Sequence, residues 1–392
     1  MKNLIFLLST LCLATSLLVS CGNDDNGDEI IIPENTLDEL TQLGQDILGE
    51  ESFQLAEAEV ELSADGRTMI IGAPERFTET DLSGFARVYR LNGTIWEQLG
   101  NDIGGDNGTY YNVGEAVSIS DDGNIIAVNS AVRTSDTRSH LRIFKFNNET
   151  WEQVGDDIIG EPNGQSGRAG LTSLNEDGTV VAFVDSAIGD ISDEVIVYQF
   201  NGSTWLQQGD PIASVPAGIK LSKDGSTLAI GGISGASVYT YTNQNWILKG
   251  QQLNSESNAI FIVGLSSDNN TIVIGSIVYE FINNEWVQKG SELDISLARA
   301  GAISDDGKYA VIANDFGGDN SNGEVGLFKY ENDSWVLIGD TILGETSEKL
   351  GRSLDISSDG KTIAIYAPGN STNGDNSGLV RVYTINGDLL SL

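Results

Sequence analysis

The chain has 392 residues, of which 40% are hydrophobic, 46 are Gly and only 6 are Pro. This composition supplies a large core with many turns, which is typical of all-β proteins. The 57 acidic and 21 basic residues give a formal net charge of −36. Such a charge repels phosphate backbones, which argues against nucleic acid as a partner, and it favours solubility outside the cell.

Residues 1–20 are predicted to be a signal peptide. Lys2 precedes an apolar run from Leu4 to Val19 that is short and wrongly flanked for a transmembrane helix. The run ends in Leu18-Val19-Ser20-Cys21-Gly22, which resembles a bacterial lipobox. That resemblance implies cleavage before Cys21 and attachment of lipid to its thiol, which would tie the chain to a membrane. The alternative is an ordinary secretory signal in which the cysteine occurs by chance.

Residues 21–37 are predicted to form a flexible tether. The run from Gly22 to Glu29 is polar and acidic and cannot bury itself. An acidic run after a lipidated cysteine resembles the export signal of surface lipoproteins of the Bacteroidetes. This resemblance implies a position on the outer membrane, facing outward. The alternative is a solubilising spacer on a lipoprotein that faces the periplasm.

Residues 38–392 carry a repeated skeleton in which Trp is followed by Gly and then by Ile or Leu. A copy near the N-terminus, Leu40/Gly44/Ile47, has Leu in place of Trp. The six copies with Trp are Trp96/Gly100/Ile103, Trp151/Gly155/Ile158, Trp205/Gly209/Ile212, Trp246/Gly250/Leu253, Trp286/Gly290/Leu293 and Trp335/Gly339/Ile342.

A second repeated signature is the turn Ser-x-Asp-Gly, which suits a β-hairpin because Asp and Gly tolerate positive φ. Two copies differ: Asn175 stands in place of Ser, and Asn269 stands in place of Gly. The seven copies begin at Ser63, Ser120, Asn175, Ser222, Ser266, Ser304 and Ser357. Their uneven spacing indicates loops of varying length on a fixed scaffold.

Each turn separates a short alternating strand, such as 60–62, from an apolar run, such as 180–183. A third strand and a tight turn, such as Asn92-Gly93, lead to the Trp strand. Four antiparallel strands repeated seven times predict an all-β, seven-bladed β-propeller over residues 38–392, with each Trp packed between neighbouring blades. We expect the N-terminal strand, residues 40–48, to complete the last blade in preference to a competing strand at 388–392.

Two repeats combine an Ala-Pro end of the second strand with a Gly-led third strand that ends in Val-Tyr. They are Ile70–Pro74 with Gly84–Tyr89, and Ala364–Pro368 with Gly378–Tyr383. This combination resembles the FG-GAP repeats of integrin-alpha-type propellers. Blades of that family usually hold an Asp-rich calcium loop between the first two strands. Here the short Ser-x-Asp-Gly turn offers too few oxygen ligands, so the resemblance does not carry calcium to those loops.

The sequence offers no catalytic constellation that can be located. His140, the only histidine, is expected at a loop edge at the start of a third strand, and it cannot form an imidazole zinc site alone. Cys12 would leave with the signal peptide, so the mature chain has no internal disulfide and no thiolate metal site. The many carboxylates could include a pair for glycoside hydrolysis, but no pair is identifiable.

Two loops between second and third strands are rich in Asp, Asn and Gly. Asp315, Asp319, Asn322 and Asp375 are candidate ligands for Ca²⁺ in these loops. Their spacing matches no EF-hand, and the same residue types are common in ordinary turns. We expect no other cofactor.

The predicted function is a surface-anchored, non-catalytic propeller that recognises a protein or a glycan on its loop face. One alternative is a polysaccharide-degrading propeller enzyme, which would place acids with separated pKa values at one mouth of the central channel. Another is a structural subunit of an outer-membrane complex, which would expose an apolar patch. A glycan binder would instead expose aromatic side chains along a groove.

Overall fold

The computed structural model describes residues 39–55, 57–74, 84–104, 110–132, 139–160, 171–185, 193–232, 235–254 and 264–385. These residues belong to one compact unit that spans residues 37–392. The predicted signal peptide, Cys21, the tether and the competing strand at 388–392 lie outside the described residues. The described elements are strands throughout, which confirms the all-β prediction. None of the described segments forms a helix that could span a membrane.

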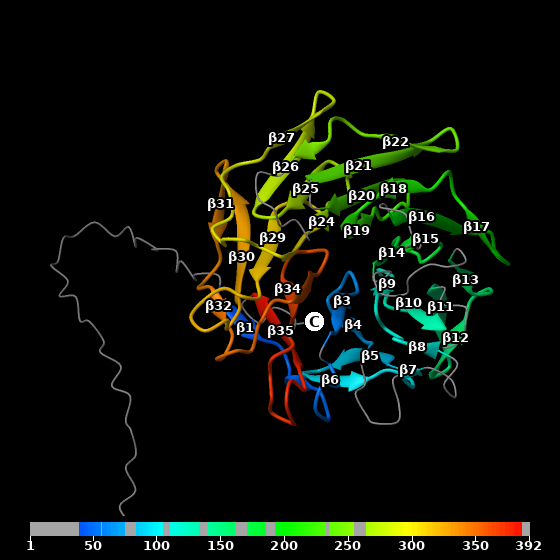
Figure 1. Ribbon diagram of the computed structural model, residues 1–392. Coiled ribbons are helices and arrows are strands. Elements are labelled where there is room, and N and C mark those ends of the chain that lie inside the picture. Colours follow the sequence, from blue (N-terminus) through cyan, green and yellow to red (C-terminus); the bar gives the residue numbers. More distant parts are fainter. Residues whose placement is uncertain are drawn as a thin grey trace, which may run out of the picture. The chain divides into compact units, whose positions relative to one another are not determined.

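Seven antiparallel sheets stand around a common axis, which confirms the predicted seven-bladed propeller (Figure 1). We number the blades in chain order from the sheet that begins with β3. Blade 1 contains β3 (Glu59–Leu62), β4 (Thr68–Ala73), β5 (Phe85–Asn92) and β6 (Ile95–Gln98). Blade 2 contains β9 (Val117–Ile119), β10 (Ile125–Val132), β11 (Ser139–Asn147) and β12 (Thr150–Gln153), and β8 (Tyr110–Tyr111) pairs with β10.

The next four blades repeat this order. Blade 3 contains β14 (Thr172–Leu174), β15 (Val180–Asp185), β16 (Asp193–Phe200) and β17 (Trp205–Gln207). Blade 4 contains β19 (Pro216–Leu221), β20 (Thr227–Gly232), β21 (Gly235–Thr242) and β22 (Asn245–Leu248). Blade 5 contains β24 (Gly264–Leu265), β25 (Thr271–Ile274), β26 (Ile277–Ile282) and β27 (Glu285–Gln288). Blade 6 contains β28 (Ala300–Ile303), β29 (Tyr309–Asn314), β30 (Glu324–Glu331) and β31 (Ser334–Leu337).

Blade 7 closes the ring with both ends of the propeller chain. It contains β33 (Ser353–Ile356), β34 (Thr362–Ala367), β35 (Leu379–Ile385) and, as its outermost strand, β1 (Leu40–Gln42). Leu40 pairs with Ile385, and Gln42 pairs with Tyr383. The prediction that the N-terminal strand completes the last blade is therefore confirmed, and Figure 1 shows β1 beside β35.

The outermost strand of most blades is broken into two pieces at the Gly of the Trp skeleton. The second pieces pair again with the third strand: β2 (Ile47–Leu48), β7 (Ile103–Gly104), β13 (Ile158–Ile159), β18 (Ile212–Ser214), β23 (Leu253–Asn254) and β32 (Ile342–Leu343). The break returns the Ile or Leu of the skeleton to the core, since Ile103 and Ile158 are buried.

Each Trp joins its blade to the preceding blade, as predicted. Its indole Nε1 donates a hydrogen bond to the carbonyl just before the preceding repeat's Gly. The pairs are Trp96–Leu43 (3.0 Å), Trp151–Leu99 (2.9 Å), Trp205–Val154 (2.9 Å), Trp246–Gln208 (2.8 Å), Trp286–Lys249 (2.8 Å) and Trp335–Lys289 (2.8 Å). A buried indole N–H needs such a partner.

The Gly of the skeleton accommodates the next blade's indole. Gly100 has φ of 74°, and a Cβ there would lie 2.9 Å from Cδ1 of Trp151. A side chain at this position would therefore meet both backbone strain and the neighbouring ring. Within one repeat, the Trp thus contacts the preceding blade, and the Gly contacts the Trp of the following blade.

The Ser-x-Asp-Gly turns are held by their own side chains. Ser63 Oγ donates to Asp65 Oδ1 at 2.6 Å and accepts the N–H of Thr68 at 2.9 Å. Asn175 does the same work with its amide, donating to Asp177 at 2.9 Å and accepting from Val180 N at 2.8 Å. Asn269 adopts φ of 62°, which explains why it can replace Gly. The two copies that differ therefore keep the same turn.

Candidate functional site

The innermost strands enclose a central channel with a cavity volume of about 550 Å³. Strands β3, β9, β14, β19, β24, β28 and β33 contribute its lining. The position two residues before each turn occupies the same face of the innermost strand in every blade, because alternate residues share a face. The residues there are Glu61, Ser118, Ser173, Lys220, Gly264, Ala302 and Asp355.

Four of these side chains accept a backbone N–H from the next blade's innermost strand. Those N–H groups lie on the free inner edge of a sheet and need acceptors. The contacts are Glu61 with Ile119 N (2.8 Å), Ser118 with Leu174 N (2.9 Å), Ser173 with Leu221 N (3.0 Å) and Asp355 with Leu62 N (2.8 Å). Polar side chains on the innermost strands therefore hold neighbouring blades together.

The face that carries the Ser-x-Asp-Gly turns, which we call the turn face, narrows around a ring of backbone hydrogen bonds. In six of the seven turns the second residue donates its N–H to the main-chain oxygen of the same residue in a neighbouring turn. The bonds are Ala64–Asp121, Asp121–Glu176, Glu176–Lys223, Ser267–Asp305, Asp305–Ser358 and Ser358–Ala64, at 2.9–3.0 Å. Within this ring the ammonium of Lys223 forms ion pairs with Asp121 and with Asp305 (2.6 Å) and donates to Ser358 Oγ (2.9 Å).

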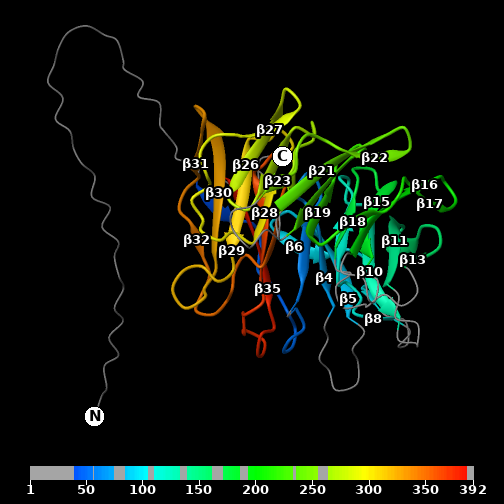
Figure 2. The same cartoon turned by 45° about the horizontal axis from the view of Figure 1, so that its top comes forward.

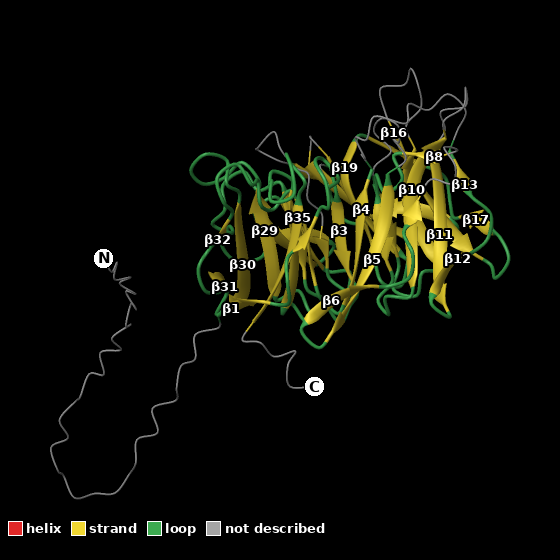
Figure 3. Ribbon diagram, turned by 90° about the horizontal axis from the view of Figure 1, so that it is seen from below, coloured by secondary structure: helices red, strands yellow, loops and turns green. Residues whose placement is uncertain are grey.

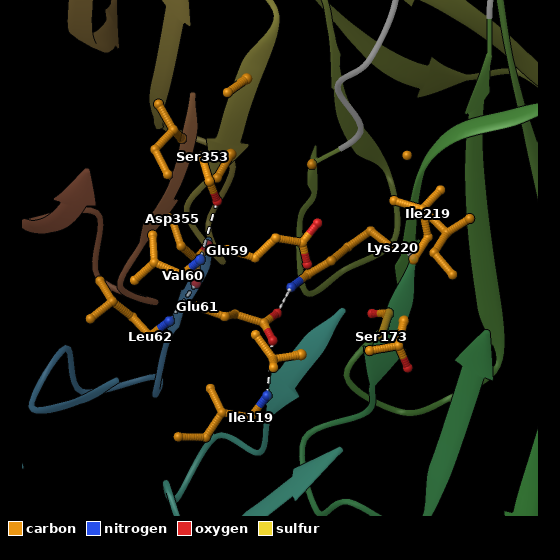
Figure 4. A pocket seen from close by; sticks show the side chains of 18 of the residues that line it. Glu59, Val60, Glu61, Leu62, Ile119, Ser173, Ile219, Lys220, Ser353 and Asp355 are labelled. Carbon is orange, nitrogen blue, oxygen red and sulfur yellow. Dashed lines mark hydrogen bonds and ion pairs between the residues drawn. The ribbon is translucent and has the colours of Figure 1, made fainter. Parts of the chain in front are cut away.

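A second lysine crosses the channel above this ring. Lys220 Nζ, from blade 4, lies 2.6 Å from Glu61 Oε1 of blade 1 (Figure 4). Burial alone would lower the pKa of Lys220, but the carboxylates of Glu61 and Asp355 raise it above its ordinary value. Lys220 is therefore a fixed positive charge that bridges opposite sides of the ring.

The carboxyl groups around Lys220 are held partly out of water. Burial raises the pKa of Glu59 to about 8, and the nearby charges of Glu61 and Glu115 add to that effect. Burial also raises the pKa of Asp355 to about 6, although Lys220 opposes the shift. Figure 4 shows Glu59 and Glu61 turned toward the Lys220 chain. Glu59 therefore stays largely protonated at neutral pH.

The opposite face, which we call the loop face, carries the longer connections between strands, as Figures 2 and 3 show. Its channel mouth is lined in part by Glu57, Asn112, Glu115, Arg299 and Arg352. Arg352 lies 3.9 Å from Glu57. This mouth holds two cations on the blade 6 and blade 7 side and carboxylates on the blade 1 and blade 2 side.

The predicted cation ligands occupy two loops of this face. Asp315, Asp319 and Asn322 follow β29 in blade 6, whereas Asp375 lies between β34 and β35 in blade 7. Asp315 is buried, and its oxygens lie 3.5 Å from Arg299 and 3.8 Å from Arg352. The main-chain oxygen of Asp375 accepts the N–H of Phe53 at 3.0 Å. The described residues contain no group of three or more His, Cys, Asp or Glu placed to hold a metal.

His140 lies at the start of β11, as the sequence predicts, and its Nδ1 is 2.9 Å from Asp157 Oδ2. Ser130 pairs with His140 across the strands, but its hydroxyl donates to the main-chain oxygen of His140 at 3.2 Å. Neither residue is among those that line the channel. The aspartates equivalent to Asp157 in blades 7 and 1, Asp46 and Asp102, bind arginines instead. The His140 pair therefore occupies a position used elsewhere for a structural ion pair.

Sequence reasoning did not locate Glu59, Glu61, Lys220 or Asp355. Their signal was available, since each lies at an even number of residues before a Ser-x-Asp-Gly turn and therefore on the same face of its innermost strand. Arg299 and Arg352 carried no comparable signal, because their approach to Asp315 depends on how two loops fold.

Comparison with known proteins supports the fold and leaves the family open. No protein-family model matches the chain, and no curated protein matches it. Among solved structures 989 chains match, one of them from the "Crystal Structure of Mitotic Checkpoint Complex". That chain is 15% identical, with a TM-score of 0.57, over 96% of this chain and 99% of its own length. Such a likeness shows a propeller fold and no particular role, because one fold hosts many unrelated functions.

Proposed function

We propose that this chain is a non-catalytic binding or scaffold propeller whose partner is a protein. The observation that supports the proposal is the distribution of exposed apolar side chains. Among the described residues, the large exposed hydrophobic side chains other than Ile95 and Ile159 fall between Leu206 and Leu343. This segment covers the outer part of blade 3 through blade 6, so most of the exposed apolar side chains lie in one part of the ring.

The outer edges of these blades share one exposed apolar position. The residue after each Trp is Leu206, Ile247, Val287 or Val336 in blades 3–6, with exposed fractions of 54%, 52%, 40% and 50%. The same position holds Glu97 in blade 1 and Glu152 in blade 2. The fold therefore tolerates a charge at this position, and the apolar choice in four consecutive blades supports a contact with another protein.

A glycan partner has less support. Sugar-binding grooves expose aromatic rings, yet Phe316 is the one aromatic residue among the large exposed hydrophobic side chains of the described part of the chain. The six Trp indoles are committed to contacts between blades.

The alternative of a polysaccharide-degrading enzyme draws support from the raised pKa values of Glu59 and Asp355 in the channel. However, the carboxylate of Asp355 accepts a backbone N–H from blade 1, and Glu61 is paired with Lys220. These contacts account for Asp355 and Glu61 as parts of the ring. Product analysis after incubation with algal and bacterial polysaccharides tests this alternative, and released oligosaccharides would establish it.

We further propose that the propeller is tethered through lipid on Cys21 to the outer membrane and faces outward, as an FG-GAP-like surface lipoprotein that could serve an outer-membrane complex. The supporting features are the lipobox-like sequence, the acidic run after it and the net charge of −36. Labelling with a palmitate analogue should mark the wild-type chain and not Cys21→Ser. Protease added to intact cells should remove the propeller if it faces outward, and protection would place it inside.

The experiment for the protein partner uses the quadruple variant Leu206→Glu, Ile247→Glu, Val287→Glu and Val336→Glu. A photo-crosslinking residue at exposed position 245, which shares a strand face with Ile247, should capture a defined polypeptide in cells that express the full chain. The quadruple variant should unfold at the same temperature as wild type, because blades 1 and 2 already carry Glu there, and should lose the cross-link. A cross-link that survives all four substitutions, or no cross-link in wild type, would refute this surface.

A further inference from the structure

Beside the loop-face mouth of the channel, Phe316 stands between two cations. We propose that this place binds a segment of a partner protein in which a carboxylate side chain neighbours an aliphatic one, with Arg299 and Arg352 contacting the carboxylate. The proposal rests on the proposed protein-binding function and adds the chemistry of one contact.

The aromatic ring is exposed and held in place. Phe316 is 51% exposed, with the Arg299 guanidinium 4.9 Å and the Lys349 ammonium 5.7 Å from its ring centroid. Its N–H donates to Asn314 Oδ1 at 3.1 Å. Cations over the ring leave less room for a sugar to stack, so the ring edge suits an aliphatic side chain better.

The two arginines are positioned by a buried acid. Asp315 is 1% exposed, and Arg299 and Arg352 approach its two oxygens at 3.5 Å and 3.8 Å. Their side chains remain 27% and 42% exposed at the channel mouth. Asp315 thus attracts both guanidinium groups to one place by charge, and their exposed parts can donate hydrogen bonds to a carboxylate that arrives from solvent.

Two exposed aliphatic residues lie on loops bound to the Phe316 loop. Leu297 is 68% exposed, and the carbonyl of neighbouring Ser296 accepts from Asn314 Nδ2 at 2.9 Å. Leu343 is 56% exposed, and the N–H of the next residue, Gly344, donates to Gly323 O at 3.1 Å. The loops therefore form one rim with apolar and cationic side chains together.

Charge selects the partner. Arg299, Lys349 and Arg352 gather on this rim of a chain whose net charge is −36. Glu57 lies 3.9 Å from Arg352. Asp319 and Glu345 are exposed acids on the same loops. Repulsion from distant acids is screened beyond roughly 8 Å at physiological salt, so the contact itself decides the preference for a carboxylate.

The test is a peptide array probed with the full chain. One set fixes Glu and Leu two residues apart, where an extended segment presents both on one side. Matched sets carry Gln or Lys in place of Glu, and a polyuronate is tested in parallel. We expect the Glu set to bind at least about tenfold more tightly than the Gln set in fluorescence anisotropy, and the Lys set to bind less.

Two variants report on the site separately. Phe316→Ser removes an exposed side chain and should leave the unfolding temperature unchanged while weakening peptide binding at least about tenfold. The double variant Arg299→Gln with Arg352→Gln should bind the Glu and Gln peptide sets equally. A triple variant that adds Asp315→Asn removes the buried carboxylate that the double variant would leave without a cation. The quadruple outer-edge variant serves as the control and should bind peptides normally.

Equal binding of the Glu and Gln sets, no binding to any set, binding unaffected by Phe316→Ser, or binding of the polyuronate alone would each overturn the inference. A cross-link at position 245 alongside negative arrays would refute this contact and leave the proposed function standing. The absence of both the cross-link and peptide binding would refute this contact and the proposed function together.

Discussion

The outer and inner margins of the ring join the same blades by different means. At the outer margin, six identical Trp-to-carbonyl bonds of 2.8–3.0 Å repeat around the ring. At the inner margin the acceptor changes from blade to blade: Glu61, Ser118, Ser173 and Asp355 serve, while Ala302 occupies the same position in blade 6. The outer joints are uniform and apolar, whereas the inner joints are individual and polar.

This difference shows at which margin of the ring the residue type can vary between blades. An indole packed between two blades needs the same Gly and carbonyl each time, so six of the seven outer joints keep Trp, and Leu40 stands in its place in blade 7. An inner N–H next to a channel can use a hydroxyl, a carboxylate or water. The inner margin is therefore free to collect charge, which is why the perturbed acids occur there.

The largest effect should come from removing an outer joint. Trp286 is 3% exposed and binds Lys249 O, so Trp286→Ala should lose about 3–5 kcal/mol of unfolding free energy in denaturant titrations. Trp286→Phe keeps much of the packing and should lose less. Equal losses for the two variants would mean that the hydrogen bond, rather than packing, dominates the joint.

The acids of the inner margin should make the free energy of unfolding depend on pH. Glu59 has a folded pKa of about 8 against an ordinary value of 4.5, so the folded state holds its proton longer than the unfolded state. Stability should therefore fall as pH rises from about 5 to 8, by at most about 4 kcal/mol. Channel water lowers this figure.

Glu59→Gln tests that assignment. The variant cannot ionise, so its stability should change less between pH 5 and pH 8 than that of wild type, measured by denaturant titration at each pH. Asp355→Asn is the companion variant, since the pKa of Asp355 is raised to about 6 and its slope should lie at lower pH. If Glu59→Gln kept the same dependence of stability on pH as wild type, that dependence would come from another group.

A glycine pair separates backbone strain from the outer joint. Gly100 and Gly93 both have positive φ, 74° and 61°, but a Cβ at Gly100 would lie 2.9 Å from Trp151 whereas one at Gly93 meets nothing within 4 Å. Gly93→Ala should cost about 1 kcal/mol, and Gly100→Ala about 1–3 kcal/mol more. Thermal unfolding of both variants checks the difference. Equal losses of stability would show that the Trp151 indole moves to make room for the added methyl group.

The smallest effect should come from an inner joint. Ser173 Oγ accepts the N–H of Leu221 at 3.0 Å, so Ser173→Ala should cost about 1–2 kcal/mol in denaturant titrations. Ala302 already occupies this position in blade 6, so the fold itself should survive. No loss of stability would show that channel water replaces the hydroxyl.

The sequence by itself determined the blade count, the strand order and the closure of the ring. It could do so because the Trp skeleton and the Ser-x-Asp-Gly turn are local patterns, and their contacts recur in every blade. Even the exceptions could be interpreted locally, since Asn175 reproduces the hydrogen bonds of Ser and Asn269 adopts the positive φ of Gly.

Only the tertiary structure decided which polar residues meet. Lys220 and Glu61 are far apart in the chain, and their 2.6 Å contact exists because blades 4 and 1 face each other across the axis. Asp315, predicted as a cation ligand, lies instead between Arg299 and Arg352, which come from two other loops. Local patterns specify strands and turns, whereas a charge finds its partner through the closed ring, which no local pattern records.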